Sequence, residues 1–276
     1  MPRKVVAITG ASSGIGAEFA RRLAPEHDLL LIARREDKLD ELAAKLTDQY
    51  GCQVETIVAD LSTDAGIAAV AEKLKNDPRL TLLINNAGFG ARGRFWESPL
   101  AVQDQMHMLH VMATVRLTHA ALQNLVAQNS GAIINVASVA AFLRSQGAVS
   151  YGATKTWMTT FAEGLYLDLK GAGSRVRVQA LCPGFTYTGF HDAMGAERSN
   201  LAGSGFWMTA EHVVDASLNG LLRNKLFVIP GWRYRLVAAL LPKLPSAFRL
   251  QMETALGRRR DAQILQQQAE SKQLSH

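Results

Sequence analysis

Tyr151 and Lys155 lie four residues apart, and Ser138 lies thirteen residues before the tyrosine. On a helix, this four-residue spacing puts both side chains on one face, with the ammonium beside the phenol. A positive charge there favours the phenolate and lowers the phenol pKa from about 10 toward neutrality. Such a tyrosine can serve as a general acid or base, and a nearby serine hydroxyl can hydrogen-bond the same substrate oxygen. The spacing often arises by chance, so the surrounding elements must decide its meaning.

A glycine-rich turn stands near the N-terminus. The segment TGASSGIG, residues 9–16, follows the first predicted strand and leads into a predicted helix. Glycines let the backbone approach a pyrophosphate closely, and the helix start supplies free N–H groups. A glycine turn alone would also suit a chain reversal that binds nothing, but its place between strand and helix favours a dinucleotide. The residues expected to contact it are Gly10, Ser12, Ser13, Gly14, Ile15 and Gly16.

Two arginines, Arg34 and Arg35, follow the second predicted strand. Folds that bind NAD usually carry an acid at this place, which hydrogen-bonds the ribose 2′-hydroxyl. Arginine instead suits a 2′-phosphate, through its charge and its forked donors. The alternative is a solvated helix start, but arginines there oppose the helix dipole. The pair therefore predicts NADP (NADPH) as the cofactor in preference to NAD.

Short apolar runs alternate with longer helix-like segments. We predict strands at Lys4–Ile8, Asp28–Ala33, Gln53–Ala59, Leu80–Asn85, Ala132–Ala137, Arg175–Leu181 and Leu226–Ile229. We predict helices at about Gly14–Leu23, Lys38–Gln49, Asp64–Lys75, Pro99–Ala127, Ser150–Lys170 and Ala210–Arg223. Near-continuous apolar strands are typical of a sheet buried on both faces. The alternation predicts an α/β fold, a single doubly wound Rossmann-type domain with a mostly parallel, seven-stranded sheet.

The chain has 276 residues, of which 48% are hydrophobic, enough for a sizeable core. We expect a catalytic domain at residues 1–230, a basic helical extension at 231–260 and a flexible tail at 261–276. The extension holds seven basic residues and one acid, which accounts for the whole net charge of +6. The rest of the chain is neutral overall, so the charge does not indicate nucleic-acid binding.

The extension contains two short amphipathic patterns, one before Pro242 and one between Ser246 and Gly257. Three roles stay open for them: covering a substrate cleft or a subunit contact, lying on an anionic membrane surface, or forming an ordinary solvated tail. No apolar run reaches the length of a membrane span, and the N-terminus runs at once into a strand. The two cysteines lack redox or zinc spacing. We therefore expect a cytoplasmic protein without a disulfide scaffold.

Taken in order, these motifs resemble those of the short-chain dehydrogenase/reductase family, in its compact NADP-preferring branch. The resemblance covers roughly residues 4–230. It implies an NADP-dependent carbonyl reductase or alcohol dehydrogenase, assembled as a homodimer or homotetramer. It also implies further cofactor contacts from Asp60, Leu61, Asn86, Ala87, Gly88, Tyr151, Lys155, Pro183, Gly184, Thr186 and Thr188.

The resemblance implies hydride transfer between the cofactor and a ketone or aldehyde. Tyr151 is then the acid or base, Ser138 polarises the carbonyl, and Lys155 binds the nicotinamide ribose and lowers the tyrosine pKa. Two other functions stay open: a non-catalytic NADP-binding regulator or scaffold, and an epimerase-type relative with no net cofactor turnover.

His110 stands where the family usually has an asparagine that helps to hold a proton-relaying water. The imidazole can replace the amide in that relay, since it both donates and accepts hydrogen bonds. Alternatively, main-chain groups hold the water, or activity is weakened and the protein binds NADP without turnover. His107 and His119 lack ligand spacing with His110, so we predict no metal.

The substrate is expected above the carboxyl ends of the strands. Candidate lining segments are Phe89, Phe95-Trp96, residues 140–144 and a lid at residues 185–207. Their aromatic side chains favour a bulky or apolar substrate, although any one of them could equally pack the lid shut.

Overall fold

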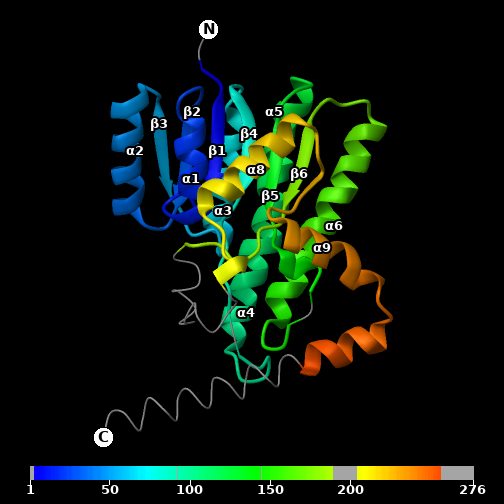
Figure 1. The fold of residues 1–276 in the computed structure, drawn as a ribbon. Helices are drawn as coiled ribbons and strands as arrows, with labels where there is room; N and C mark the ends of the chain where they lie inside the picture. The colour runs from blue at the N-terminus through cyan, green and yellow to red at the C-terminus, as the bar shows by residue number, and fades with distance from the viewer. Residues whose placement is uncertain (1–2, 92, 144, 189–203, 256–276) are drawn as a thin grey trace, which may run out of the picture.

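The computed structural model describes residues 3–91, 93–143, 145–188 and 204–255. Its centre is a seven-stranded sheet in the order β3-β2-β1-β4-β5-β6-β7, in which every neighbouring pair is parallel. The strands are β1 (Val5–Thr9), β2 (Asp28–Ala33), β3 (Val54–Val58), β4 (Leu80–Asn85), β5 (Ala132–Val136), β6 (Arg177–Leu181) and β7 (Phe227–Val228). The predicted α/β class and sheet are confirmed (Figure 1).

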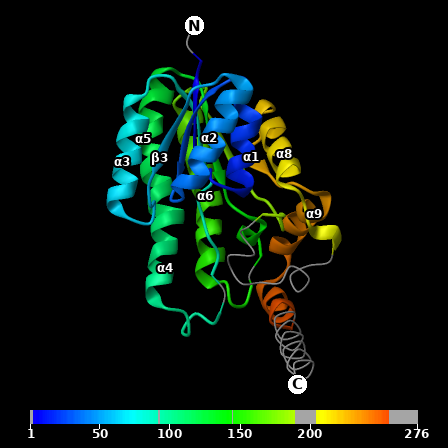
Figure 2. The ribbon, with the colours of Figure 1, turned by 90° about the vertical axis from the view of Figure 1, so that its left-hand side faces the viewer.

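Helices cover both faces of the sheet, as Figure 2 shows. One layer consists of α1 (Gly14–Leu23), α2 (Glu36–Tyr50) and α8 (Ala210–Leu222). The opposite layer consists of α3 (Asp64–Asn76), α4 (Leu100–His107), α5 (Ala113–Ala127) and α6 (Val149–Gly171). Every residue of β1, β2 and β5 is buried, as expected for strands covered on both faces. Because the strands are parallel, their carboxyl ends share one edge, and the candidate site residues follow those ends.

The predicted helix Pro99–Ala127 is interrupted. Between α4 and α5, residues Met108–Met112 form a π-turn, in which the Ala113 N–H bonds the Met108 carbonyl. A π-turn holds one residue more than an α-turn, which rotates the helix beyond it by about 100°. The sequence pattern did not indicate this change. His110 lies within the turn and is buried at 1% exposure.

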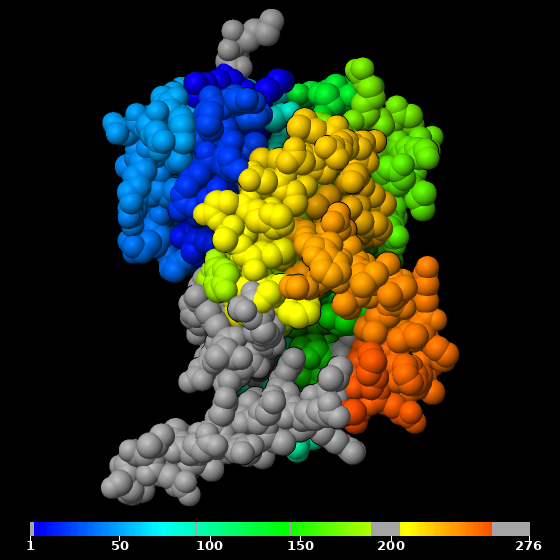
Figure 3. Space-filling model, in the orientation of Figure 1, coloured from blue at the N-terminus to red at the C-terminus, as the bar shows by residue number. Residues whose placement is uncertain are grey.

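The chain continues past β7 into α9 (Trp232–Leu240), and residues 246–255 form a further helix. These two helices lie within the range predicted for the helical extension. Figure 3 shows α8 and α9 forming one continuous surface, yellow to orange. Most of the expected lid, the arginines after Gly257 and the tail at 261–276 lie outside the described residues. Within the described ranges, no helix combines the length and apolarity needed to span a bilayer.

Candidate active site

The glycine turn joins β1 to α1, and its backbone conformation requires glycine at several positions. Gly10 and Gly14 have φ angles of +67° and +56°, a region that glycine adopts without strain. A Cβ on Gly16 would lie 2.4 Å from the Gly10 carbonyl oxygen, so only glycine fits this approach. The Ser13 side chain does not cap α1, and the first turn of α1 contains no acid. The N–H groups at this helix start therefore suit a pyrophosphate, and Ile15 packs on the core below.

Thr9 and Asn86 fasten the glycine turn to the loop after β4. The Thr9 hydroxyl accepts hydrogen bonds from the N–H groups of Asn86 and Ala87, both at 2.9 Å. The Asn86 amide in turn donates to the Thr9 carbonyl at 2.8 Å. Gly10 lies so close to this loop that a Cβ there would stand 2.9 Å from the Ala87 Cα. The Asn86 side chain thus supports the turn, and the backbone of Ala87 and Gly88 remains to face a nucleotide.

Arg34 and Arg35 are exposed at the carboxyl end of β2. Arg35 donates to the hydroxyls of Ser12 and Ser13, at 2.9 and 2.8 Å, and so lies across the glycine turn. Beside them, the Asp60 carboxylate accepts from the N–H and hydroxyl of Ser62. Burial opposes its ionisation, but the Ser62 hydrogen bonds and the Arg34 charge lower the pKa of Asp60. Leu61, the next residue, is buried in the core.

Ser138 and Tyr151 meet at the ends of β5 and α6. Ser138 caps a short 3-10 helix, Val139–Ala141, by accepting from the Ala140 N–H at 3.1 Å. Its hydroxyl also hydrogen-bonds the Tyr151 phenol, and this bond partly counters the rise that burial causes in the phenol pKa. Two hydroxyls directed at one another form a pair that can contact a single substrate oxygen.

Lys155 lies on the same face of α6 as Tyr151, with its Nζ 5.8 Å from the centre of the tyrosine ring. The ammonium is buried at 4% exposure and donates to the Val136 carbonyl at 2.8 Å. Burial lowers the pKa of Lys155 to about 8, partly countered by Cys182. The expected fall in the Tyr151 pKa is not seen: burial raises it, and only Ser138 opposes that rise. Desolvation of the phenolate outweighs the lysine, whose Nζ is held by a carbonyl rather than by the phenol.

The Lys155 pKa predicts a pH-dependent stability. The folded protein holds this pKa near 8, below the value of 10.5 for a solvated lysine, so the unfolded chain binds more protons between those pH values. Stability therefore rises with pH across that window. Between pH 7 and pH 10 we expect the wild type to gain about 2 to 3 kcal/mol relative to Lys155→Met, as measured by urea unfolding. A constant difference between the two proteins would contradict the assigned shift.

His110 contacts the site from the π-turn. Its Nε2 accepts from the Phe89 N–H at 3.2 Å, and its Nδ1 lies 2.9 Å from the Thr154 hydroxyl. Its ring stands edge-on to Tyr151, with ring centres 6.0 Å apart. Burial, followed by the charges of Lys155 and His107, holds the pKa of His110 well below its usual value. The imidazole is therefore neutral.

The segment Pro183–Thr188 closes the site from the end of β6. The buried Pro183 carbonyl accepts from the Val139 N–H at 2.9 Å, beside Ser138. The Thr186 hydroxyl donates to the Gly184 carbonyl at 3.0 Å. Thr188 reaches the glycine turn, because a Cβ on Gly14 would meet its Cγ2 at 3.0 Å. The segment thus spans from Ser138 to the N-terminus of α1.

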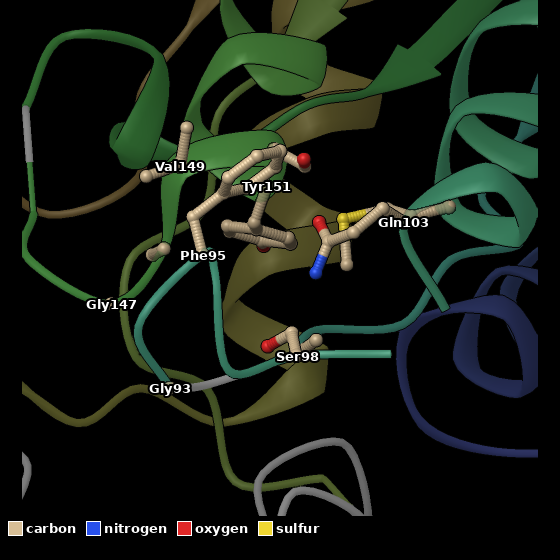
Figure 4. Close-up of a pocket in the computed structure, with 11 residues that line it drawn as sticks. Gly93, Phe95, Ser98, Gln103, Gly147, Val149 and Tyr151 are labelled. Carbon is tan, nitrogen blue, oxygen red and sulfur yellow. The ribbon is translucent and has the colours of Figure 1, made fainter. Parts of the chain in front are cut away.

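Aromatic residues stand on the outer side of Tyr151. A small pocket beside it is lined partly by Phe95, Gln103 and Val149, and Figure 4 shows Phe95 and Gln103 next to the tyrosine. Tyr187 stacks on Trp207 at the described base of the expected lid, with ring centres 5.0 Å apart. Trp96, predicted with Phe95, is 76% exposed and does not line this pocket.

The residues present fit a dinucleotide. The first turn of α1 contains no acid, and Arg35 lies across the glycine turn that precedes it. The same turn lies against the Ala87 backbone. Ser138, Tyr151 and Lys155 lie together after β5 and on α6, at the same carboxyl edge of the sheet. Within the described part of the chain, no group of histidines, cysteines and acids could hold a metal ion.

Comparison with known proteins decides the family. The model of the family described as short chain dehydrogenase matches residues 4–199. The chain belongs to the short chain dehydrogenase family. It is therefore an oxidoreductase built to use a nicotinamide cofactor.

Three solved structures are similar to this chain over most of their length. A Sphingobium yanoikuyae enzyme in complex with NADPH is 36% identical, with a TM-score of 0.79 over 90% of this chain and 98% of its own. A bulky-bulky ketone specific alcohol dehydrogenase of Comamonas testosteroni is 32% identical, with a TM-score of 0.75 over 90% and 97%. A Burkholderia phymatum protein in complex with NAD is 28% identical, with a TM-score of 0.77 over 87% and 92%.

Sequence reasoning missed three residues of this short chain dehydrogenase that support the site. Thr9 joins the glycine turn to Ala87, although the motif containing it was recognised. Thr154 bonds His110, and only its place between Tyr151 and Lys155 could have drawn attention to it. Tyr234, from α9, accepts from the Phe185 N–H at 3.0 Å and donates to the Phe206 carbonyl at 2.8 Å. The pattern identified Tyr234 only as part of an apolar stripe.

Proposed function

We propose that the protein is an NADP(H)-dependent carbonyl reductase or alcohol dehydrogenase acting on a bulky or apolar substrate. One observation carries this proposal: Tyr151, Ser138 and Lys155 converge at the carboxyl edge of the sheet, the edge at which the glycine turn also lies. The cofactor, when bound, supplies or accepts the hydride.

The protein's own residues manage the proton and the charge. In reduction, Tyr151 donates its phenolic proton to the carbonyl oxygen, and the Ser138 hydroxyl stabilises the negative charge that develops there. Lys155 supplies a buried positive charge 5.8 Å from the tyrosine ring, which favours the phenolate left behind. In oxidation the same groups act in reverse, and the phenolate accepts the alcohol proton.

Preference for NADP rests on Arg34 and Arg35. Both side chains are exposed; Arg35 contacts the glycine turn, and the Arg34 charge acts on Asp60. Helix α2, which follows them, begins with the acids Glu36 and Asp37. Since those acids satisfy the dipole of α2, the arginines remain available for a 2′-phosphate. The similar Sphingobium enzyme is a complex with NADPH, which agrees with this preference.

A bulky substrate is supported by aromatic side chains in the pocket beside Tyr151 and at the base of the expected lid. Phe95 lies beside the tyrosine, and the Tyr187–Trp207 stack stands next to Phe185. Such rings favour large apolar groups on the carbonyl carbon. The likeness to a ketone-specific alcohol dehydrogenase from Comamonas testosteroni points the same way.

We further propose a homodimer or homotetramer in the cytoplasm. Helix α6 presents a 64% exposed Leu167, and the stacked Trp157 and Phe161 lie on the same helix, which suits a subunit contact. Cys52 and Cys182 are free thiols, both buried, in keeping with a reducing compartment.

A substrate panel tests the proposed function. Purified protein is mixed with NADPH and with ketones and aldehydes of increasing size, and NADPH oxidation is followed by absorbance. We expect the highest kcat/KM for carbonyls with two large substituents, and a lower value for short aldehydes. If NADPH binds but no carbonyl is reduced, the protein is a non-catalytic regulator or scaffold and not a reductase. Inversion of a substrate stereocentre without net loss of NADPH would indicate an epimerase.

A further inference from the structure

His110 takes part in a directed chain of hydrogen bonds. The Phe89 N–H can only donate, so Nε2, at 3.2 Å, must accept. A neutral imidazole then carries its proton on Nδ1, which donates to the Thr154 hydroxyl at 2.9 Å. The Thr154 hydroxyl in turn donates to the Tyr151 carbonyl at 3.0 Å. Every donor in the chain meets one acceptor, so the arrangement permits a single tautomer.

This chain connects two parts of the site that are distant in sequence. At one end lies the loop after β4, where a Cβ on Gly88 would stand 2.9 Å from the His110 Nε2. At the other end lies the first turn of α6, which carries Tyr151. The ring fills the space between them, 1% exposed, with Phe89 and Tyr151 each 6.0 Å away between ring centres.

A proton carrier needs a nitrogen that faces the incoming proton. Both nitrogens of His110 are already engaged, one as an acceptor and one as a donor. Protonation of Nε2 would set its N–H against the Phe89 N–H, in a buried space shared with the Lys155 ammonium. The titratable groups around the ring are Lys155 and Tyr151 from α6 and His107 from α4. The charges of Lys155 and His107 both oppose a second proton on the imidazole.

We propose that His110 is a positioning residue, a neutral strut that fixes the loop after β4 against the helix carrying Tyr151 and Lys155. Thr154 is its obligatory partner. The π-turn contributes to this arrangement because it directs the imidazole inward, between the loop after β4 and helix α6. The inference rests on the proposed function, because it treats that loop and Tyr151 as parts of one cofactor site.

Four variants separate a strut from a proton carrier. His110→Gln keeps one donor and one acceptor but cannot take up a proton, whereas His110→Phe keeps the ring shape and loses both bonds. Thr154→Val removes the partner hydroxyl at constant shape, and Thr154→Ser retains it. We expect His110→Phe and Thr154→Val each to weaken NADPH binding roughly tenfold, as measured by fluorescence titration. His110→Gln and Thr154→Ser should stay close to wild type.

The double variant His110→Phe/Thr154→Val tests whether the two residues form one unit. Because both substitutions break the same chain, we expect it to bind NADPH no more weakly than the worse single variant. The shape of the pH–kcat profile and the solvent isotope effect should not change in His110→Gln. Equal loss of turnover in His110→Gln and His110→Phe, with wild-type NADPH binding in both, would show that His110 carries protons and would overturn the strut.

The tautomer supplies a test that requires neither cofactor nor turnover. Nitrogen-15 NMR of the wild type should show His110 with its proton on Nδ1, unchanged between about pH 6 and pH 8.5. Both ring nitrogens are engaged, and burial, with the Lys155 charge, holds the pKa of His110 well below its usual value. A proton on Nε2, or titration within that range, would refute the proposal. If instead the tautomer is as expected and NADPH binds but no carbonyl reacts, the proposed function fails and the strut stands.

Discussion

Tyr151→Phe is expected to lower kcat by roughly 10³-fold, because it removes the phenol that exchanges a proton with the substrate oxygen. The ring shape is retained, and with it the edge-on contact with His110. The dissociation constant for NADPH should change by less than about threefold, since the phenol makes at most one hydrogen bond to the cofactor. Stopped-flow turnover and fluorescence titration measure the two quantities.

The matched control is Tyr166→Phe, the same change on the same helix. Tyr166 packs against the core and beside Lys170, away from Ser138. This control should retain wild-type turnover. If Tyr151→Phe keeps most of its activity while Tyr166→Phe behaves as expected, Tyr151 is not the acid or base and the proposed mechanism is wrong.

Arg34→Ala is expected to weaken NADPH binding roughly 10- to 100-fold and to leave NADH binding within about twofold. The reason is the loss of charged hydrogen bonds to a 2′-phosphate, which NADH lacks. Arg35→Ala should show the same selectivity with an added loss for NADH, because Arg35 also holds the Ser12 and Ser13 hydroxyls of the shared glycine turn.

Lys38→Ala controls for net charge. Lys38 lies on α2 and pairs with Glu41, so its removal changes the charge equally without removing a cation that faces the turn. We expect it to bind both cofactors as the wild type does. Equal losses of NADPH and NADH affinity in Arg34→Ala would remove the basis for an NADP preference.

The sheet could be predicted because its strands are nearly uniform apolar runs. β2 and β4 occur at the predicted bounds, since Asp28–Ala33 and Leu80–Asn85 are bracketed by polar residues. The convergence of Ser138, Tyr151 and Lys155 followed from parallel strand topology, which places the ends of β5 and β6 beside the start of α6.

The π-turn could not be predicted, because one additional residue in a helix leaves no compositional mark at Met108–Met112. The raised pKa of Tyr151 was also missed. The four-residue spacing predicts that Lys155 lies near the Tyr151 phenol. It does not show that the Lys155 Nζ donates to the Val136 carbonyl, or that burial has the largest effect on the Tyr151 pKa. The hydrogen bond between Thr154 and His110 could not be predicted either, because it depends on which imidazole nitrogen accepts from the Phe89 N–H.

Transfer of deuterium to a ketone, from NADPH that carries deuterium at both C4 positions, is the most direct test of the central claim. The account predicts that the product alcohol carries one deuterium on the former carbonyl carbon per NADPH oxidised, and that Tyr151→Phe forms this product roughly 10³-fold more slowly. An alcohol without deuterium, or no alcohol while NADPH remains bound and unchanged across the whole panel, would contradict it.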